Sequence, residues 1–351
     1  MTTTNISSNY LTTAMLPSIA QTQATLAADG VELSTGQYAN LGLQLGDQSG
    51  YELSLKNEYQ QLQSLTTSNT VVTTDMTTAQ DALNAILSDA QSAQSSLTTW
   101  TSNAATSSPT LETIGADGLQ ALTSMANTTS NGAYVFGGVN NGVAPMNDYF
   151  STPASAASTA VSNAFTSALT AAGATPSTIS ASDMQTFLNG PFAALFTGSS
   201  WTSDWSNASS TNTTAEIAPG QTSVTSTNIN QPGFQDITEG YTMLAAFGNA
   251  GLSPSAQQAV ASTALSLISQ GVTALTSQTA NLGSSMAQVT NATNSMSSQM
   301  TILQTQIGNL DNVNSSAVAT QLTQLSTQLE TAYQLTSQIT KLSLAQYLPV
   351  A

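Results

Sequence analysis

The sequence predicts a mainly α-helical protein in which nested terminal helices form a coiled-coil rod and a small mixed or β-containing tip domain is inserted in the middle. Two long apolar stripes repeat in 3-4 alternation, a period typical of helices that coil around partner helices rather than coat a globular core. Between the stripes, the chain loses this period and becomes rich in Ser, Thr, Ala, Gly and Asn. We expect a terminal helix pair (1–45 with 312–351), a coiled-coil rod (46–149 with 251–311) and an outer tip domain (150–250).

The first element is a sparse helical stripe over residues 1–35, in which Pro17 starts or kinks a helix. A stripe this sparse cannot offset the ordering entropy of about thirty residues, so it needs partners. Gly36 ends it in a turn, and the Gly-rich stretch over residues 42–50 is not expected to be helical. The apolar positions of the stripe are Ile6, Leu11, Met15, Ile19, Leu26 and Leu33.

The first long helix is expected to run from near Tyr51 to about Trp100, and Asn69 is the polar exception in its stripe. At about 1.5 Å per residue, each long helix would extend roughly 60 to 75 Å. Its positions in the rod core are Leu62, Leu65, Val72, Met76, Leu83, Ile86 and Leu97.

A break, a shorter helix and a hairpin follow. Residues 107–109 (Ser-Ser-Pro) end the long helix, and apolar spacing predicts a second helix over residues 111–125. The Asn-Gly pair that opens residues 131–138 is a tight-turn signal, and Tyr134 alternates with Phe136 as in a half-buried strand. We therefore expect a β-hairpin here.

The predicted tip domain draws much of its apolar bulk from Trp201, Trp205 and several phenylalanines. Two tryptophans four residues apart are more often part of a small core than an exposed platform for stacking sugars. We expect them to be core residues.

The second long helix begins with Ser253 as N-cap and Pro254 at the first helical position. Its stripe continues to Leu310, with threonine at two positions. Its positions in the rod core are Leu282, Met286, Val289, Met296, Met300, Leu303, Ile307 and Leu310.

The last helix follows an interruption at residues 311–316. The stripe resumes at Val318, eight residues after Leu310 where the repeat requires seven, so it rotates toward a different partner. The natural partner is the sparse helix of residues 1–35. The apolar positions here are Val318, Leu322, Leu325, Leu329, Ile339 and Leu342.

The charge balance excludes several partners. The chain has 2 Lys+Arg against 18 Asp+Glu and a net charge of -16, so we expect no nucleic acid partner, because a phosphate backbone requires several cations.

No uninterrupted apolar run approaches the length of a membrane span, so no membrane contact is expected. The first residues lack a basic and an apolar region, which argues against a cleavable secretory signal.

Catalysis is not expected either. Cysteine and histidine are absent, which removes thiol chemistry, the commonest metal ligand and the usual base of a serine nucleophile. Asp75, Asp81 and Asp89 share one long helix and are interpreted as solvated surface. We therefore predict no catalytic, cofactor-binding or metal-binding residues, and no enzyme.

Three short motifs suggest a relationship. They are the Ser34-Thr35-Gly36 turn, the hairpin from Ala126-Asn127 to Tyr134-Val135-Phe136-Gly137-Gly138, and the ending Leu342-Ser343-Leu344-Ala345-Gln346-Tyr347-Leu348. With these motifs the chain resembles the flagellin superfamily over about its first 150 and last 100 residues, and within it the hook-filament junction proteins. The segment from Trp201 to Ser209 is similar to alphaproteobacterial members. Gln37 and the loop after it depart from the basic residue and paired aspartates of many members, so the salt bridges of those aspartates are not carried over.

The resemblance implies a structural protein of the bacterial flagellum, exported unfolded through the type III apparatus with a chaperone. It would join hook to filament as a ring of its own copies, between a neighbouring hook-associated protein and flagellin. The terminal helices would then pack into an inner tube. The expected assembly interface is Ile6, Leu11, Met15, Ile19, Leu26, Leu33, Val318, Leu322, Leu325, Leu329, Ile339, Leu342, Leu344, Tyr347 and Leu348.

Three alternatives remain open. The protein can be a filament flagellin, or a flagellin-like surface adhesin that binds glycans through the two tryptophans. The stripes alone also fit an ordinary intramolecular helical bundle.

Overall fold

The computed structural model describes residues 8–102 and 109–345, and side chains within 13–102 and 111–339. The chain is mainly helical, with long helices from both ends packed together and a small strand-containing insertion, which confirms the predicted fold class. It divides into two compact units, Met1–Gln61 with Ser298–Ala351 (unit 1) and Leu62–Ser297 (unit 2). The finer division into a terminal pair, a rod and an outer tip remains a prediction.

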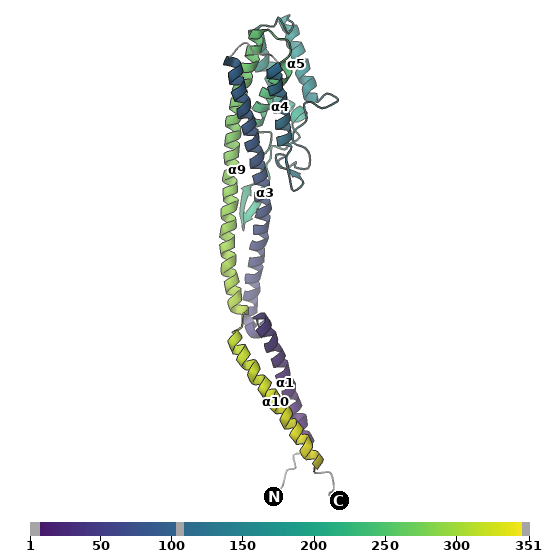
Figure 1. The fold of residues 1–351 in the computed structure, drawn as a ribbon, viewed down its shortest axis with the longest axis vertical. Helices are drawn as coiled ribbons and strands as arrows, with labels where there is room; N and C mark the ends of the chain where they lie inside the picture. Colours follow the sequence, from purple (N-terminus) through teal and green to yellow (C-terminus); the bar gives the residue numbers. More distant parts are fainter. Residues whose placement is uncertain (1–7, 103–108, 346–351) are drawn as a thin grey trace. The chain divides into compact units, whose positions relative to one another are not determined.

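Unit 1 contains the terminal helix pair. Helix α1 (Ser8–Thr35) and helix α10 (Ser315–Ala345) lie side by side in antiparallel directions (Figure 1). Pro17 lies inside α1, and Gly36, with a positive φ of 73°, follows its end. The predicted pairing of the first and last helices is therefore confirmed.

The Gly-rich stretch is helical, so the prediction made for it was wrong. Helix α2 (Leu41–Leu45) begins at Asn40, whose side chain accepts the Leu43 amide at 3.3 Å. A short 3-10 turn (Gly46–Gln48) leads from it into helix α3 (Ser49–Ser102). Gly46 has a φ of 49° and caps α2, so here a glycine separates two helices without preventing either.

The two long helices occur where the stripes predict them. Helix α3 runs antiparallel to helix α9 (Pro254–Asp311), and Gln94 Nε2 donates to Ser269 Oγ at 2.9 Å between them. Asn69 Nδ2 donates to Thr293 Oγ1 at 3.0 Å and to the Ile217 carbonyl at 2.8 Å. The polar exception in the first stripe thus holds a strand against both helices.

Two small antiparallel hairpins lie in unit 2. Strand β1 (Thr129–Ser130) pairs with β2 (Ala133–Tyr134) around a turn whose Asn131 and Gly132 have φ values of 50° and 82°. Those positive values explain the Asn-Gly pair, so the predicted turn and hairpin are confirmed. The strand ends at Tyr134, however, and both Val135 and Phe136 are buried in the turn after it, so the predicted alternation through Phe136 was wrong. Strand β3 (Thr214–Ala218) pairs with β4 (Gln221–Val224), and Asn69 binds this second hairpin.

Gly138 must be glycine because of what lies beside it. Its φ is 60°, and a Cβ there would lie 2.5 Å from the Ser209 carbonyl oxygen. Val139 donates its amide to the Thr211 carbonyl at 3.0 Å, and Ser209 donates to the Gly137 carbonyl at 2.9 Å. The loop after the first hairpin is therefore fixed against residues 209–211.

Unit 2 also holds helix α4 (Pro109–Ala126), helix α5 (Ala156–Ala172) and helix α6 (Ala181–Phe187). Short helical turns continue from α6 to Trp205 and include helix α7 (Gly198–Ser200). This part of the chain contributes the buried aromatic residues Phe187, Phe192, Phe196, Trp201 and Trp205. The expectation that both tryptophans belong to a core is confirmed.

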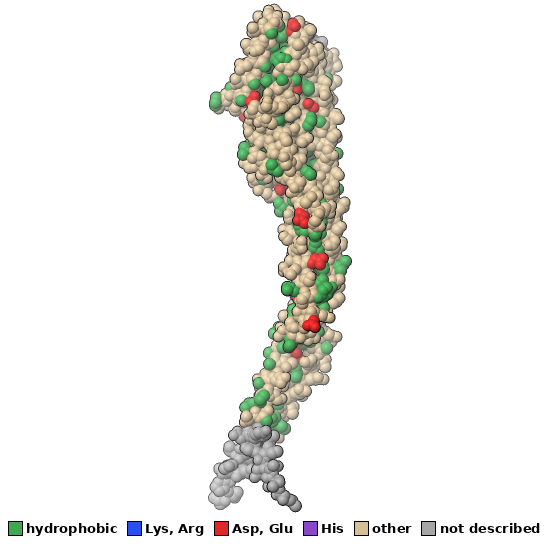
Figure 2. Space-filling model, turned by 180° about the vertical axis from the view of Figure 1, so that it is seen from behind, with side chains coloured by type: hydrophobic (Ala, Val, Ile, Leu, Met, Phe, Trp, Pro, Cys, Tyr) green, Lys and Arg blue, Asp and Glu red, His purple; other side chains and the backbone are tan. Residues whose placement is uncertain are grey.

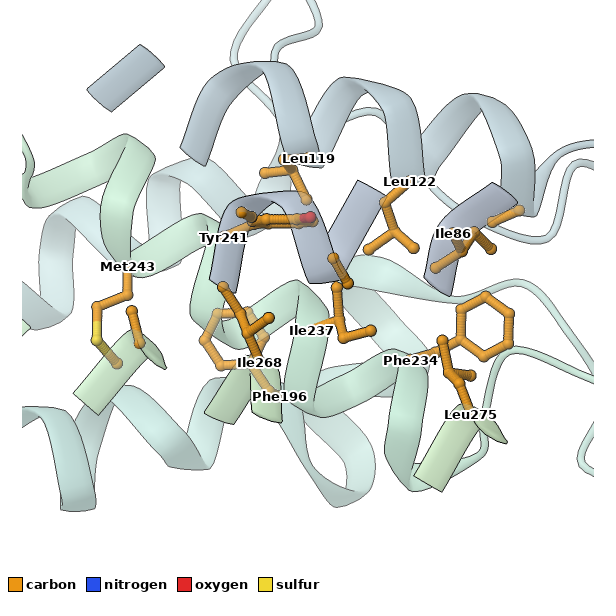
Figure 3. Packing of buried hydrophobic residues seen from close by; sticks show 14 of the residues in the cluster. Ile86, Leu119, Leu122, Phe196, Phe234, Ile237, Tyr241, Met243, Ile268 and Leu275 are labelled. Atoms are coloured by element: carbon orange, nitrogen blue, oxygen red, sulfur yellow. The ribbon is translucent and has the colours of Figure 1, made fainter. Parts of the chain in front are cut away.

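Helix α8 (Pro232–Phe247) was not predicted, and it packs at the centre of unit 2. Figure 3 shows its Ile237 and Tyr241 between Leu119 of α4 and Ile268 of α9. A Cβ on Gly118 of α4 would lie 2.5 Å from the Tyr241 ring. Glycine at this crossing lets the two helices approach closely.

The stripe residues of α3 and α9 therefore also line a globular core, whereas their period predicted packing against partner helices instead. Met76, Ile86, Ile268 and Leu275 belong to the same buried cluster as Phe234 of α8. The 3-4 period specifies which face of each helix is buried. It does not specify whether a helix, a hairpin or an aromatic cluster covers that face.

Two of the three carboxylates interpreted as solvated surface have structural partners. Asp75 Oδ1 accepts hydrogen bonds from Ser130 Oγ at 2.6 Å and Asn131 Nδ2 at 2.8 Å. Asp89 Oδ2 accepts a hydrogen bond from the Tyr241 hydroxyl at 2.6 Å. The solvated interpretation was wrong for these two, because their partners are distant in sequence.

Within the described part of the chain, α9 alone is long and apolar enough to cross a membrane by length and composition. Its most apolar 18-residue window has a mean hydropathy of 1.3 and is 33% buried. A core helix passes the same test, and α9 contributes Ile268 and Leu275 to the core.

Candidate assembly surface

The terminal pair buries only part of the apolar stripe predicted for assembly. Ile19 of α1 is 9% exposed, and the other partly covered members remain half-buried. These half-buried residues are Met15, Leu26, Val318, Leu322, Leu325, Leu329 and Ile339. Packing between the two helices alone therefore leaves most of these apolar side chains only half-buried.

Some predicted interface residues cannot be placed. Ile6, Tyr347 and Leu348 lie outside the described residues, and so do the side chains of Leu11, Leu342 and Leu344.

A second set of apolar side chains in this pair is uncovered. They are exposed by 42% to 57%, and they are Leu16, Val31, Leu33, Tyr333 and Leu335. Leu33 was predicted for the interface, whereas the other four were not. Large apolar groups gathered on one helix pair favour contact with another protein surface.

Helix α10 adds a threonine face beside Leu335. This open face is formed by residues of α10 alone, including Thr320, Thr323, Thr327 and Thr331. Each of these hydroxyls donates to the carbonyl four residues earlier, at 2.8 to 2.9 Å. Because these hydroxyl donors are already satisfied within the helix, the threonines can be buried with little loss of hydrogen bonding, whereas Gln324 and Gln328 on the same face keep amide groups for a partner. This face was not predicted, although threonine recurs every three or four residues in this part of the sequence.

The breaks at the inner ends of the two terminal helices bind each other. Val313 donates its amide to the Gly36 carbonyl at 2.9 Å, and Tyr38 donates to the Asp311 carbonyl at 3.0 Å. Gln37 and Asn312 form an antiparallel bridge between these contacts. The Ser34-Thr35-Gly36 turn is therefore joined to the break at residues 311–316.

An ion cluster lies next to this joint. Lys56 of α3 contacts Glu52 one turn earlier, and its Nζ lies 2.7 Å from Asp311 Oδ2. The hydrogen bond to Asp311, followed by that to Glu52, raises the pKa of Lys56. The spacing of Glu52 and Lys56 was a usable signal, but nothing local indicated Asp311.

Asp29 of α1 is buried in the terminal pair. Its Oδ2 has no hydrogen-bond partner among the described residues. Burial, and after it the nearby Glu32, raises the pKa of Asp29.

On the face drawn in Figure 2, acidic side chains are scattered and neutral groups fill the space between them. Repulsion between copies stacked through the terminal pair would therefore be weak.

The positions predicted for the rod core are all buried or half-buried. Buried members are Leu62, Met76, Leu83, Ile86, Leu97, Leu282, Val289, Met296 and Leu303. Half-buried members are Leu65, Val72, Met286, Met300, Ile307 and Leu310.

Two family models match the chain. The bacterial flagellin N-terminal helical region matches residues 6–141, and the bacterial flagellin C-terminal helical region matches residues 265–348. Together they cover more than half of the sequence and include α1, α3, α10 and most of α9. No curated protein matches the chain.

Proposed function

Because the chain belongs to the flagellin superfamily and is a structural subunit of the bacterial flagellum, we propose that it is the subunit that joins hook to filament. This is the type called hook-associated protein 3, in its alphaproteobacterial form. At the family level, the protein is extracellular, is exported by the flagellar system and associates with other axial subunits.

The uncovered apolar residues of the terminal pair are the observation that supports assembly. Leu16, Val31, Leu33, Tyr333 and Leu335 remain exposed on the two helices, and Leu335 lies at the threonine face of α10. Surfaces of this kind are stabilised when neighbouring copies cover them. These uncovered apolar groups support the proposal that the terminal helices pack into an inner tube.

The choice of junction over filament is supported by two motifs. Tyr134-Val135-Phe136-Gly137-Gly138 and the ending from Leu342 to Leu348 resemble junction proteins more than filament flagellins. On this proposal the subunits form a ring between a neighbouring hook-associated protein and flagellin. A chaperone guides the unfolded chain to export.

The two alternative functions, a filament flagellin and a glycan-binding adhesin, differ in how well they fit the structure. A filament flagellin would use the same terminal helices, so experiment must separate it from a junction subunit. The adhesin hypothesis required exposed tryptophans, but Trp201 and Trp205 are each 1% exposed. The Trp201 Nε1 donates to Asn230 Oδ1 at 2.8 Å, so this residue belongs to the packed interior.

Electron microscopy of a gene-deletion strain tests the proposal. A junction subunit predicts completed hooks without filaments, together with flagellin released into the medium. Normal filaments on the deletion strain would overturn the proposal. Purified protein that grows long tubes from seeds would identify a filament flagellin instead.

Complementation of that strain tests the assembly surface. We expect Leu335→Asp to leave the monomer folded but fail to restore filaments, because it places a charge on the uncovered side of α10. Val139→Asp is the matched control, since Val139 is an exposed apolar residue on a loop of unit 2. Equal restoration by both variants would remove α10 from the interface.

A further inference from the structure

Unit 2 contains a cleft whose chemistry the assembly function does not use. It has a volume of about 440 Å³ and lies between residues 224–233, from the end of β4 to the start of α8, and residues 274–285 of α9. Pockets of about 300 to 1,000 Å³ hold small molecules in proteins. The polar residues that matter here are Asn212, Thr227, Gln231, Gln278, Asn281 and Ser285.

The cleft is electrically neutral, which restricts its ligand. Residues 62–297 contain no Lys, Arg or His, so an anion or a phosphate would find no cation in this unit. The lining also contains no Asp or Glu, so a metal ion or an ammonium group would find no carboxylate. A neutral ligand that forms hydrogen bonds fits this lining best.

Gln278, which lines the cleft, has a side-chain acceptor without a partner in the described part of the chain. Its Nε2 donates to Thr227 Oγ1 and, at 3.4 Å, to the Asn228 carbonyl. Its Oε1 is buried and has no partner among the described residues. A buried acceptor without a donor costs free energy, which a ligand hydroxyl or a water molecule would recover.

Asn281 supplies both a donor and an acceptor one helical turn further along α9. Its side chain is exposed and forms no hydrogen bond with the described residues. Residues three and four apart share a helix face, so Asn281 and Ser285 lie on the same side as Gln278. Amide groups that present one donor and one acceptor match the neighbouring hydroxyls of a sugar ring.

Small apolar surfaces complete the lining. Val224, Pro232 and Leu282 lie at the cleft and can contact the C–H face of a pyranose ring. A peptide helix would need a longer apolar groove than these three side chains provide.

We propose that this cleft binds a neutral saccharide of one or two sugar units. The site is separate from the two buried tryptophans, and the proposal does not depend on whether the subunit lies in a junction or a filament. Gln278 accepts from one hydroxyl, and Asn281 both donates to and accepts from the ring.

Ligand-observed NMR and calorimetric titration of the purified full chain test this proposal. The probes are glucose, N-acetylglucosamine, maltose and diacetylchitobiose, and glucuronate is the charged counterpart of glucose. We expect at least one neutral sugar to bind saturably and glucuronate to bind at least about tenfold more weakly, because the protein is strongly negative.

Two variants localise the binding. Asn281→Ala should weaken it about tenfold, the effect of losing one or two hydrogen bonds. Asn291→Ala is the matched control, because Asn291 is also exposed on α9 but lies outside the cleft, and it should change nothing. Gln278→Leu should abolish binding while circular dichroism shows the native helix content.

Three results would overturn the proposal. One is no saturable binding of any neutral probe up to about 20 mM, far weaker than a specific site gives. The second is unchanged affinity in both Asn281→Ala and Gln278→Leu. The third is self-association that disappears in Asn281→Ala, because the cleft would then belong to a contact between copies.

Discussion

Lys56 Nζ lies 2.7 Å from Asp311 Oδ2, and Asp311 is only 2% exposed although it is the last residue of α9. The same Asp311 accepts the Tyr38 amide through its carbonyl at 3.0 Å. One residue thus joins α3, the connection after α1 and the end of α9. The chain has only two residues that are Lys or Arg, and one of them, Lys56, is used at this joint.

Lys56→Met should lower the free energy of unfolding by about 1 to 3 kcal/mol, because a buried carboxylate loses its cation. The lower part of this range reflects the lysine side chain, which is 38% exposed and partly screened by solvent. Urea denaturation measures the change. Lys56→Arg should retain most of the stability, and an equally large loss there would show that packing rather than charge matters.

Raising the pH should weaken the same joint. The pKa of Lys56 is raised from 10.5 by its bonds to Asp311 and Glu52, so its stabilising contribution is full below 10.5 and is lost as the pH rises beyond it. The wild type should therefore lose more stability than Lys56→Met at alkaline pH. Parallel curves for the two proteins would contradict the assignment.

Tyr241→Phe should destabilise unit 2 by about 1 to 3 kcal/mol, because the Asp89 carboxylate loses its donor. Burial, followed by the hydrogen bond to Asp89, raises the pKa of Tyr241, so its phenol should stay protonated when exposed tyrosines ionise. Thermal unfolding and ultraviolet titration measure the two effects. Tyr51→Phe removes an exposed hydroxyl and should leave stability unchanged.

Gly118→Ala should be among the most damaging single substitutions in α4. The new methyl group would lie 2.5 Å from the Tyr241 ring, so α4 and α8 would have to separate. A loss of about 1 to 3 kcal/mol or more is expected. Gly30→Ala in α1 meets nothing within 4 Å and should instead stabilise its helix by up to about 1 kcal/mol. Equal effects of the two changes on the denaturation midpoint would refute the close crossing.

Glu239 of α8 should make stability depend on pH near neutrality. Burial, with a smaller effect from Asp236, raises the pKa of Glu239 from 4.5 to about 7. Between these values the folded chain retains a proton that the unfolded chain has released, so stability falls as the pH rises through this window. Glu239→Gln should flatten that slope, which is at most about 1.4 kcal/mol per pH unit. The same change at exposed Glu58 should leave the slope intact.

Amide exchange should be fast over α1 and α10 in the free monomer and slow over the buried parts of α3 and α9. The terminal pair leaves large apolar groups uncovered, whereas the core of unit 2 is closed. Hydrogen exchange with mass spectrometry measures the contrast. Strong protection of both terminal helices in a confirmed monomer would refute ordering upon assembly.

Local signals were sufficient for much of the fold. The Ser253-Pro254 start, the break after Leu310 and the Asn131-Gly132 turn each depend on a few neighbouring residues, and each was predicted within a few positions. For the assembly surface, the sequence indicated the right pair of helices. It did not distinguish Ile19, which is buried between them, from Leu33, which is exposed.

The sequence by itself determined that two long helices return to each other and that the first and last helices form a separate pair, because a stripe's period and its one-residue slip are properties of consecutive residues. Only the tertiary structure decided that α8 lies in the core, that Asp75 and Asp89 bind distant side chains and that Asp311 binds Lys56. Those contacts join residues far apart in sequence, and their free energy depends on burial that no local pattern specifies.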